Sequence, residues 1–369
     1  MQGRAFVYTG AREPFELREF PVPEVAPGAI LVRLTLSNIC GSDLHGWHGD
    51  TPREYPTIMG HEMTGRVDRL GSGVTSDSAG QPLREGDRIV YSYFYPCRRC
   101  TPCLSHDQLH CSSRRIGAGR RKSDRLPHFT GAYADYYYLR PGHYVLRTPD
   151  HLSDREVSPL NCALAQVVYG LHEAGLGAGD TAVIQGAGGL GLYAAAVARE
   201  AGAVNVVVLD RIRERLELAK RFGADHALDI DEFETPERRI EAVNDLTGGG
   251  GHVVAELVGH PSALVEGIRM VRPEGSYLVI GNISARHTIE FNPAWLVHWN
   301  RRMVGVGGYQ SWALRRGLEL LDRTRDRYPW GEVLSHTWPL ESINEAFEHA
   351  DGGGAIRTGL VCAPDLAIL

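Results

Sequence analysis

The chain has 369 residues, of which 43% are apolar, and this is enough for one large domain or two ordinary domains with their own cores. Its formal net charge of −6 gives no overall attraction for nucleic acid, so we expect no nucleic-acid partner. Residues 1–20 lack the apolar core of a signal peptide, which predicts a cytoplasmic protein. In that reducing compartment, seven cysteines are expected to be metal ligands or buried thiols rather than disulfides.

Residues 1–150 predict a β-rich unit. Short runs of β-forming residues are bounded by Gly, Pro and Asp, as in "AFVYTG", "AILVRLTLSNI", "GRVDRLG", "DRIVYSY" and "AYADYYYL". This pattern favours an all-β or α+β unit.

The pattern changes near residue 150. The stretch "SDREVSPLNCALAQVVYGLHEAG" predicts a helix, because it has a Ser/Asp start, apolar residues at helical spacing and a glycine end. Strand-like and helical segments then alternate, which is typical of a doubly wound parallel sheet. From about residue 299 the pattern is mixed again, so we expect the last segment to rejoin the first unit.

One glycine-rich segment carries a dinucleotide-binding pattern. Gly186, Gly188 and Gly191 form G-x-G-x-x-G, with Gly189 and Leu190 between them, after a predicted strand and at the start of a predicted helix. The glycines permit a tight turn and close approach of the pyrophosphate to the helix N-terminus. Asp210 ends the next strand, where a carboxylate binds the ribose hydroxyls and repels a 2′-phosphate, so we predict NAD rather than NADP. The uncharged run 181–198, long enough to span a membrane, is explained by this strand and helix, and we expect no membrane segment.

Several soft ligands point to a catalytic metal. Cys40 offers a thiolate, His61 and Glu62 stand side by side, and Cys162 lies at the start of the region before the nucleotide motif. Two cysteines and one histidine around zinc, with one position open, form a catalytic ligand set. Such a zinc would polarise an oxygen and lower the pKa of a bound alcohol.

A second cysteine group lies in "CRRCTPCLSHDQLHC", where four cysteines fall within fifteen residues. On spacing alone it could be a disulfide knot, a redox switch, a zinc module for nucleic acid, a catalytic metal site or a structural metal site. The reducing compartment disfavours the first of these, and the acidic net charge disfavours the third.

Taken together, "CGSDLH", "GHE", the four-cysteine group, "NCALA" and the glycine motif resemble, in this order and over essentially the full length, the zinc-dependent alcohol dehydrogenases of the medium-chain dehydrogenase/reductase family. The resemblance implies an α/β protein with a GroES-like β-rich catalytic domain (1–163) and a Rossmann NAD-binding domain (164–302). The last segment, residues 303–369, would return to the catalytic domain. A homodimer or homotetramer is also implied.

The resemblance further implies two zinc ions per chain and NAD. A structural zinc lobe at about residues 95–115 would be closed by four thiolates, and the catalytic zinc would be held by Cys40, His61 and Cys162. Glu62 would exchange as a ligand, and Asp43 would orient His61. Ser42 would accept the alcohol proton and pass it, through the nicotinamide ribose, to His45. The structural ligands would be Cys97, Cys100, Cys103 and Cys111, and Arg357 would contact the pyrophosphate.

Two positions depart from the family pattern. Gln166 stands where relatives often have a threonine against the nicotinamide, and Gly41 stands where some relatives carry a basic residue on the phosphates. The first predicts a different nicotinamide pocket, and the second predicts weaker NAD binding with faster release of NADH.

The substrate is not specified by these motifs. The basic loop 114–125 could meet a substrate carboxylate or phosphate, or it could be a solvated loop, since almost all basic residues of the chain are arginines. Aromatic residues could line an apolar pocket or belong to the core: Trp47, Phe94, Tyr95 and Trp295. Alternatives to a simple alcohol dehydrogenase are a polyol, sugar or amino-alcohol dehydrogenase, a zinc-independent quinone reductase and a non-enzymatic binding protein. Cys40, His61 and the four-cysteine group disfavour the quinone reductase, and a binding protein would not need Ser42, His45 and a full metal set.

Overall fold

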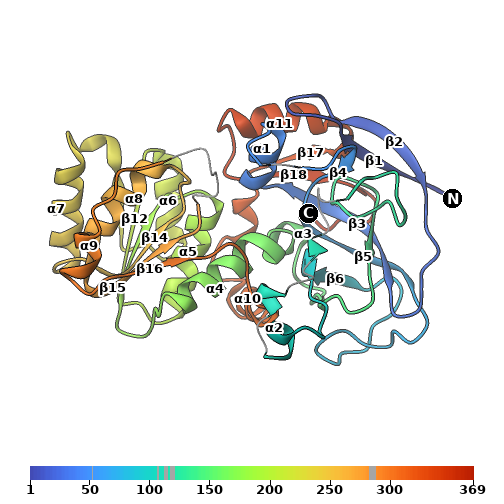
Figure 1. Cartoon of the computed structure of the whole chain (residues 1–369), viewed down its shortest axis with the longest axis horizontal. Helices are drawn as coiled ribbons and strands as arrows, with labels where there is room; N and C mark the ends of the chain where they lie inside the picture. The colour runs from blue at the N-terminus through green and yellow to red at the C-terminus, as the bar shows by residue number, and fades with distance from the viewer. Residues whose placement is uncertain (52, 106–107, 112–114, 117–120, 282–287) are drawn as a thin grey trace. The chain divides into compact units, whose positions relative to one another are not determined.

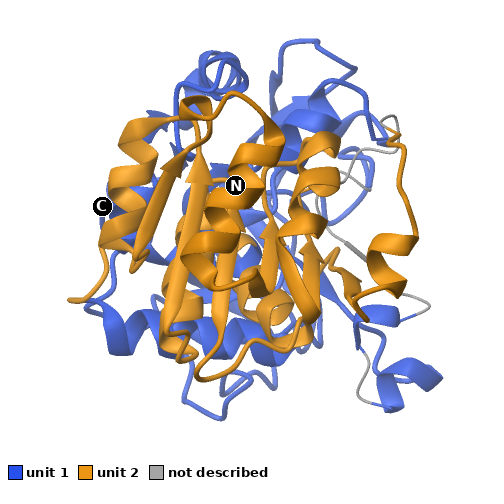
Figure 2. Ribbon diagram, turned by 90° about the vertical axis from the view of Figure 1, so that its left-hand side faces the viewer, with its two compact units in different colours: residues 1–162, 310–325, 330–369 blue, residues 163–309, 326–329 orange. Residues whose placement is uncertain are grey.

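The computed structural model describes residues 1–51, 53–105, 108–111, 115–116, 121–281 and 288–369. The chain folds into two compact units, shown in blue and orange in Figure 2. Unit 1 consists of residues 1–162, 310–325 and 330–369, and unit 2 of residues 163–309 and 326–329. The chain therefore leaves unit 1 after Cys162 and returns to it at Gln310.

Unit 1 is built around two β-sheets. The larger has the order β10-β6-β5-β3-β18-β17, with β9 also paired to β3, and the smaller has the order β2-β1-β4 (Figure 1). β3 is the central strand, and nine of its ten residues are buried because it carries a long run of apolar side chains. The strands are β1 (Gln2–Tyr8), β2 (Glu16–Pro21), β3 (Ile30–Ile39), β4 (Thr57–Ile58), β5 (Glu62–Leu70), β6 (Arg88–Tyr91), β7 (Phe94–Tyr95), β8 (Arg115–Ile116), β9 (Tyr136–Leu139), β10 (Val145–Arg147), β17 (His336–Pro339) and β18 (Thr358–Val361).

Short helices join these strands. α1 begins directly after β3, and its N-cap is Cys40. The C-terminal segments of unit 1 contribute the two longer helices and the strands β17 and β18, and β18 pairs antiparallel with β3. The helices of unit 1 are α1 (Gly41–Trp47), α2 (Thr101–Leu104), α3 (Asp154–Val157), α10 (Ser311–Thr324) and α11 (Ile343–Asp351).

Unit 2 is a doubly wound parallel sheet. Its six strands have the order β13-β12-β11-β14-β15-β16, so the sheet grows outward in both directions from β11. The strands are β11 (Thr181–Gln185), β12 (Asn205–Asp210), β13 (His226–Asp229), β14 (Gly251–Glu256), β15 (Val271–Val279) and β16 (Arg302–Gly305). The helices are α4 (Ala165–Glu173), α5 (Gly189–Glu200), α6 (Arg213–Arg221), α7 (Pro236–Thr247), α8 (Pro261–Gly267) and α9 (Ala294–Val297).

The core of unit 2 lies against this sheet. Val183, Val207 and Val254 come from three adjacent strands and pack with Ile240 and Val243 of α7. The uncharged run 181–198 is the buried strand β11 followed by the turn and most of α5, as the sequence predicted. Among the residues that the structure describes, no helix has the length and apolar character needed to cross a membrane.

The structure differs from the sequence analysis in three places. The helix predicted across "SDREVSPLNCALAQVVYGLHEAG" is divided into α3, a π-helical turn (Leu160–Leu164) and α4. The cause is Pro159, which has no N–H to donate and cannot continue the hydrogen-bond pattern. β13 and α7 were not anticipated, and β16 belongs to the parallel sheet although residues 303–305 were assigned to the C-terminal return.

Candidate active site and metal centres

Strand register brings the first metal-binding group together. β3 and β5 pair antiparallel with Asn38 opposite Glu62, so Cys40 after the end of β3 and His61 before the start of β5 emerge at the same end of the sheet. Cys162 reaches this place from the π-helical turn, an irregularity that often marks a functional position. One ligand atom from each of Cys40, His61, Glu62 and Cys162 lies within 4.8 Å of all the others. The structure therefore brings the predicted ligands of the catalytic zinc to one buried point.

The histidine of this group is oriented by a carboxylate. His61 Nδ1 lies 3.3 Å from Asp43 Oδ1, which leaves Nε2 as the nitrogen facing Ser42 Oγ at 3.4 Å. Asp43 itself is held by the backbone N–H of Cys40, which donates to Asp43 Oδ2 at 3.2 Å. A carboxylate on the far nitrogen fixes the ring and its tautomer, as around metal-binding histidines in general.

The protonation of the two cysteines is interdependent. A hydrogen bond from Cys162 and the nearby His61 hold the pKa of the Cys40 thiol well below its usual range, although burial opposes this. The same hydrogen bond, together with burial, raises the pKa of Cys162. Burial lowers the pKa of His61, but Asp43 and Cys40 outweigh it, and the net shift is upward. The lowered pKa favours the thiolate form of Cys40, which is the form that binds a metal ion.

Glu62 and Arg357 form a buried ion pair in the same group. Arg357 Nη1 contacts Glu62 Oε2, and both side chains are almost fully buried. Burial raises the pKa of Glu62 to about 7, although Arg357 opposes the shift. Glu62 Oε1 is buried and has no hydrogen-bond partner among the described residues. The contact predicted between Arg357 and the pyrophosphate remains a prediction, because the Arg357 guanidinium forms an ion pair with Glu62 in this structure.

The predicted proton path begins on α1. Ser42 and His45 are three residues apart on this helix and therefore lie on one face of it. The His45 side chain is 31% exposed, and its Nδ1 lies 3.1 Å from Asp50 Oδ2. Asp50 was not selected from the sequence, although it stands in the same short stretch, "HGWHGD". Arg53, also unselected, donates from Nη2 to the carbonyl oxygen of Ser42 at 3.0 Å.

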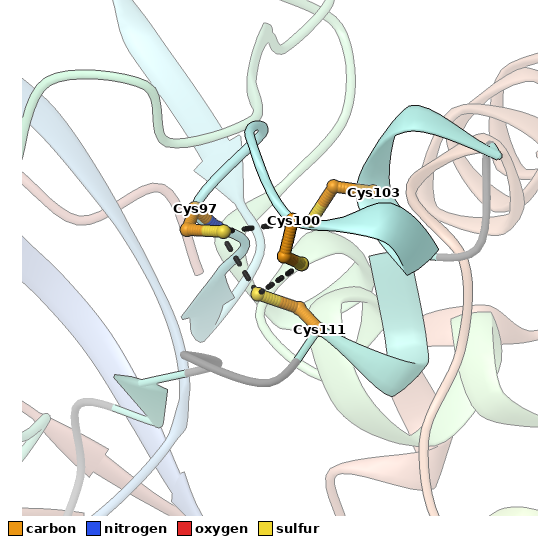
Figure 3. A group of neighbouring side chains, drawn as sticks. All are labelled: Cys97, Cys100, Cys103 and Cys111. Atoms are coloured by element: carbon orange, nitrogen blue, oxygen red, sulfur yellow. Dashed lines mark hydrogen bonds between the residues drawn. The ribbon is translucent and has the colours of Figure 1, made fainter.

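The four cysteines of the second group meet around one point (Figure 3). Their sulfur atoms all lie within 4.8 Å of one another, with Cys97 Sγ 4.0 Å from Cys103 Sγ and Cys100 Sγ 3.8 Å from Cys111 Sγ. None of the seven cysteines forms a disulfide. Burial and the neighbouring thiols raise the pKa of Cys103 to about 12, so in the absence of a cation this position favours the protonated thiol.

Both groups fit zinc. The first offers two thiolates, one imidazole and a carboxylate oxygen that lacks a partner, and the second offers four thiolates, which is a closed tetrahedral set. An open catalytic site and a closed structural site are the two arrangements that zinc adopts in proteins. The ligand assignments predicted from the sequence are therefore compatible with the geometry.

Beside the structural lobe lies a buried histidine. His143 is 9% exposed, its Nδ1 lies 3.0 Å from the carbonyl oxygen of Arg140, and its ring packs on Tyr95 at 4.7 Å. Burial and the positive charge of Arg98 lower the pKa of His143 to about 3. His143 therefore stays neutral in the folded protein at pH values where an unfolded histidine is charged.

We predict a loss of stability on acidification that depends on His143. Between about pH 6.5 and pH 3 the unfolded chain binds one more proton than the folded chain at this residue, so the free energy of unfolding falls by about 1.4 kcal/mol per pH unit. In His143→Asn, which keeps an N–H for Arg140, the loss between pH 7 and pH 5 should be about 2 kcal/mol smaller than in the wild type. Urea unfolding at both pH values measures this. The exposed His298→Asn is the control, and an equal loss in wild type and His143→Asn would refute the assignment.

The nucleotide motif has the geometry that the glycines predict. Gly186 has a φ of +98°, and a Cβ on Gly191 would stand 1.8 Å from the Gly186 carbonyl oxygen, so neither position accepts a side chain without movement. Gly188 is the N-cap of α5, and Gly189 and Leu190 form its first turn. Asp210 Oδ2 accepts the backbone N–H of Ala187 at 2.6 Å, so the carboxylate also holds the glycine turn.

The two departures from the family pattern are also located. Gln166 donates from Nε2 to the carbonyl oxygen of Val306 at 3.0 Å, which ties α4 to the segment after β16. Gly41 is the first residue of α1, and a Cβ added there would meet nothing within 4 Å. The space for a larger side chain at Gly41 therefore exists.

The aromatic residues that contact the first group of ligands differ from those expected. Tyr93 packs edge-on against His61 at 5.2 Å, and it was not selected from the sequence. Phe94 packs on Tyr93, Tyr95 packs on His143, and Trp47 packs on Phe347. Trp295 packs on Phe291 in unit 2. The basic loop 114–125 lies partly outside the described residues; in its described part, Arg121 accepts a hydrogen bond from Thr57 through its carbonyl oxygen.

Comparison with known proteins identifies the family. Residues 26–150 match the alcohol dehydrogenase GroES-like domain, and residues 189–323 match the zinc-binding dehydrogenase domain. The chain is 32% identical over 345 residues to 5-exo-hydroxycamphor dehydrogenase of Pseudomonas putida, covering 93% of this chain and 94% of that protein. The chain belongs to the zinc-dependent alcohol dehydrogenases of the medium-chain dehydrogenase/reductase family.

Two further relatives agree with this membership. The chain is 33% identical to a probable D-xylulose reductase A of Emericella nidulans, covering 99% of this chain and 98% of that protein. An alcohol dehydrogenase from Thermotoga maritima of known structure superposes with a TM-score of 0.92 at 30% identity, covering 98% of this chain and 99% of the other. The fold class predicted from the sequence is thereby confirmed, and the protein is an oxidoreductase of this zinc-dependent alcohol dehydrogenase family.

Proposed function

We propose that this enzyme oxidises an alcohol reversibly to a ketone or aldehyde, with NAD as the hydride acceptor. The observation that carries the proposal is the buried group of Cys40, His61, Glu62 and Cys162, whose ligand atoms lie within 4.8 Å of one another. Relatives named for hydroxycamphor and xylulose act on secondary alcohols and their ketones, so we expect a secondary alcohol as substrate. The ring of Tyr93 against His61 supplies an apolar surface beside the reacting group.

Zinc bound to Cys40, His61 and Cys162 would act as a Lewis acid that makes the substrate hydroxyl more acidic. The chain's own contribution is the arrangement of charge around that place. Asp43 orients His61, and Arg357 compensates the carboxylate of Glu62. Because these groups are buried and held in advance, little reorganisation is needed when charge develops on the substrate oxygen.

The proton of the alcohol leaves along α1. Ser42 Oγ lies 3.4 Å from His61 Nε2, so its hydroxyl is beside the metal ligands and can take up the substrate proton. His45 lies on the same face of the helix and is partly exposed, so it can release the proton to solvent. Asp50 Oδ2, 3.1 Å from His45 Nδ1, holds the ring in place on this side of the helix.

The choice of NAD rests on Asp210. Its carboxylate ends β12 beside the glycine turn, where it repels a 2′-phosphate. The neighbouring Arg211 is exposed and lies 3.9 Å from Asp231, so its charge is directed toward an acidic side chain. We expect the cofactor to be NAD, the enzyme to be cytoplasmic and the assembly to be a homodimer or homotetramer.

The test is the rate of NADH or NADPH formation, followed by absorbance, over a matched set of alcohols. The set contains neutral primary and secondary alcohols, a polyol such as xylitol, and an anionic alcohol such as 3-hydroxybutyrate. We expect turnover with NAD and the highest kcat/KM for neutral secondary alcohols. Turnover confined to NADP would overturn the role of Asp210, and no turnover of any alcohol by the zinc-loaded enzyme would overturn the proposed reaction.

A polyol dehydrogenase is the second candidate, because the xylulose reductase relative is as similar as the hydroxycamphor relative. The same set of alcohols separates the two. A kcat/KM for xylitol above that for a cyclic alcohol would select the polyol, and turnover restricted to the anionic alcohol would assign substrate binding to the basic loop 114–125.

A further inference from the structure

Unit 2 contains a cavity of about 530 Å³ away from the nucleotide motif. It lies where β14 and β15 begin, between the turn that ends α7 and the segment before β16. The glycine motif follows the opposite, carboxyl end of β11. Because all strands of this sheet are parallel, the cavity and the nucleotide motif lie at opposite edges of the sheet.

The cavity is lined by basic side chains. Arg269, Arg272, Arg301 and His252 face it, and no Asp or Glu is among the described residues that line it. Arg269 has a partner, since its Nη1 lies 3.0 Å from Glu237 Oε1. Among the residues that the structure describes, neither Arg272 nor Arg301 has a carboxylate within ion-pair distance. Two guanidinium groups therefore line one cavity without a directly paired carboxylate among the described residues.

The positive charge of Arg301 is partly buried. Its Nε is buried and has no hydrogen-bond partner among the described residues, and its Nη1 makes only a long contact, 3.5 Å, with the carbonyl oxygen of Trp295. Burial lowers the pKa of Arg301, which means that its charge is poorly solvated in this position. An oxyanion would supply the missing acceptor.

The side chains of Arg272 and His252 face each other through two nitrogen atoms that are both hydrogen-bond donors. The backbone N–H of Thr181 donates to His252 Nδ1 at 3.0 Å, so the proton of the neutral ring is on Nε2. Arg272 Nη1 contacts this Nε2, and a guanidinium can only donate. Asp180 Oδ1 lies 3.5 Å from Nε2, too far for a good hydrogen bond. An acceptor bound in the cavity beside both groups would give each donor a partner.

The rest of the wall suits a flat ring. Trp299 is 51% exposed, and the guanidinium carbon of Arg301 lies 5.8 Å from the centre of its ring. Gly248 and Gly249 also line the cavity and leave space in it. Both have positive φ, and an added Cβ at either would meet nothing within 4 Å. Asn244 Oδ1 is buried without a hydrogen-bond partner and can accept from a ligand hydroxyl or amino group.

We propose that this cavity is a second binding site, separate from the dinucleotide site, for a small phosphate ester that carries a flat ring. Arg272, Arg301 and His252 donate hydrogen bonds to the phosphate oxygens, and those from the guanidinium groups are strong because they are charge-assisted and can be bidentate. The ring of the ligand lies against Trp299. This site shares no residue with the metal-binding groups or with the glycine motif.

The experiment is calorimetric titration of the zinc-loaded full chain with phenyl phosphate and, separately, with inorganic phosphate, with and without saturating NADH. We expect phenyl phosphate to bind with a Kd below about 1 mM in both cases. Arg272→Gln and Arg301→Gln should each weaken both ligands about tenfold or more. Trp299→Ala should weaken phenyl phosphate and leave inorganic phosphate unchanged.

Arg238→Gln is the matched control, because Arg238 is on α7 but pairs with Glu241 and does not line the cavity. It should bind both ligands as the wild type does. Thermal unfolding establishes that each variant is folded. The proposal is overturned if about 10 mM phenyl phosphate gives no binding heat with the wild type, if NADH abolishes binding, or if both arginine variants bind like the wild type.

Discussion

Cys40→Ala is expected to reduce turnover about a thousandfold or more, because losing the Lewis acid removes several kcal/mol of charge stabilisation in the transition state. Cys40 supplies one of the four ligand atoms that meet within 4.8 Å, and its thiol is the one whose pKa is held low. The variant should bind zinc at one of the two cysteine-containing groups only. Initial rates with the best alcohol of the set, and zinc content by atomic emission, measure both effects.

Two other cysteine variants separate the loss of the catalytic metal from a general effect of removing a cysteine. Cys362→Ala is the control, because Cys362 is also buried but lies beside Ser37, in neither metal-binding group. It should keep both zinc ions and most of the activity. Cys100→Ala should also lose one zinc ion, but its main effect should be lower stability of the lobe rather than loss of chemistry. Normal turnover by Cys40→Ala with both zinc ions present would disprove the assignment of Cys40 to the catalytic site.

The metal-binding groups could be predicted because their ligands stand in short, recognisable stretches. Cys40 and Asp43 lie in "CGSDLH", His61 and Glu62 lie in "GHE", and the structural cysteines are all within fifteen residues. The contact between Arg357 and Glu62 could not be predicted in this way, because 295 positions separate them in the sequence. It depends on β18 pairing with β3, which no local pattern specifies.

The secondary structure likewise divides into elements with a clear local pattern, which were predicted, and elements without one, which were not. The strongly apolar strands β3, β11 and β12 were predicted, because burial on both faces leaves a continuous apolar run. β16 was assigned to the wrong domain, because its sequence, "RMVG", is short and mostly exposed. The cavity beside it was missed for a related reason: Arg272 and Arg301 come from separate segments, and in a chain rich in arginine neither is distinctive alone.

Asp154→Ala is expected to lower the free energy of unfolding of unit 1 by about 3–5 kcal/mol, because it leaves the buried guanidinium of Arg88 without its counter-charge. Arg88 Nη2 lies 2.7 Å from Asp154 Oδ1, and the two side chains are 3% and 1% exposed. Asp154 Oδ2 also accepts the backbone N–H of Ile368 at 3.1 Å, so the same carboxylate holds the C-terminal segment. Urea unfolding of the zinc-loaded protein, followed by tryptophan fluorescence, measures the change.

Asp150→Ala is the matched control for this prediction. Asp150 is 83% exposed and lies 3.7 Å from Arg147, so its loss should change the free energy of unfolding by less than about 1 kcal/mol. The double variant Arg88→Met with Asp154→Leu removes both charges and should recover much of the stability lost in Asp154→Ala, since the cost comes from the unpaired guanidinium. If the double variant is as unstable as Asp154→Ala, the stabilisation comes instead from the hydrogen bonds between Asp154 and the C-terminal segment.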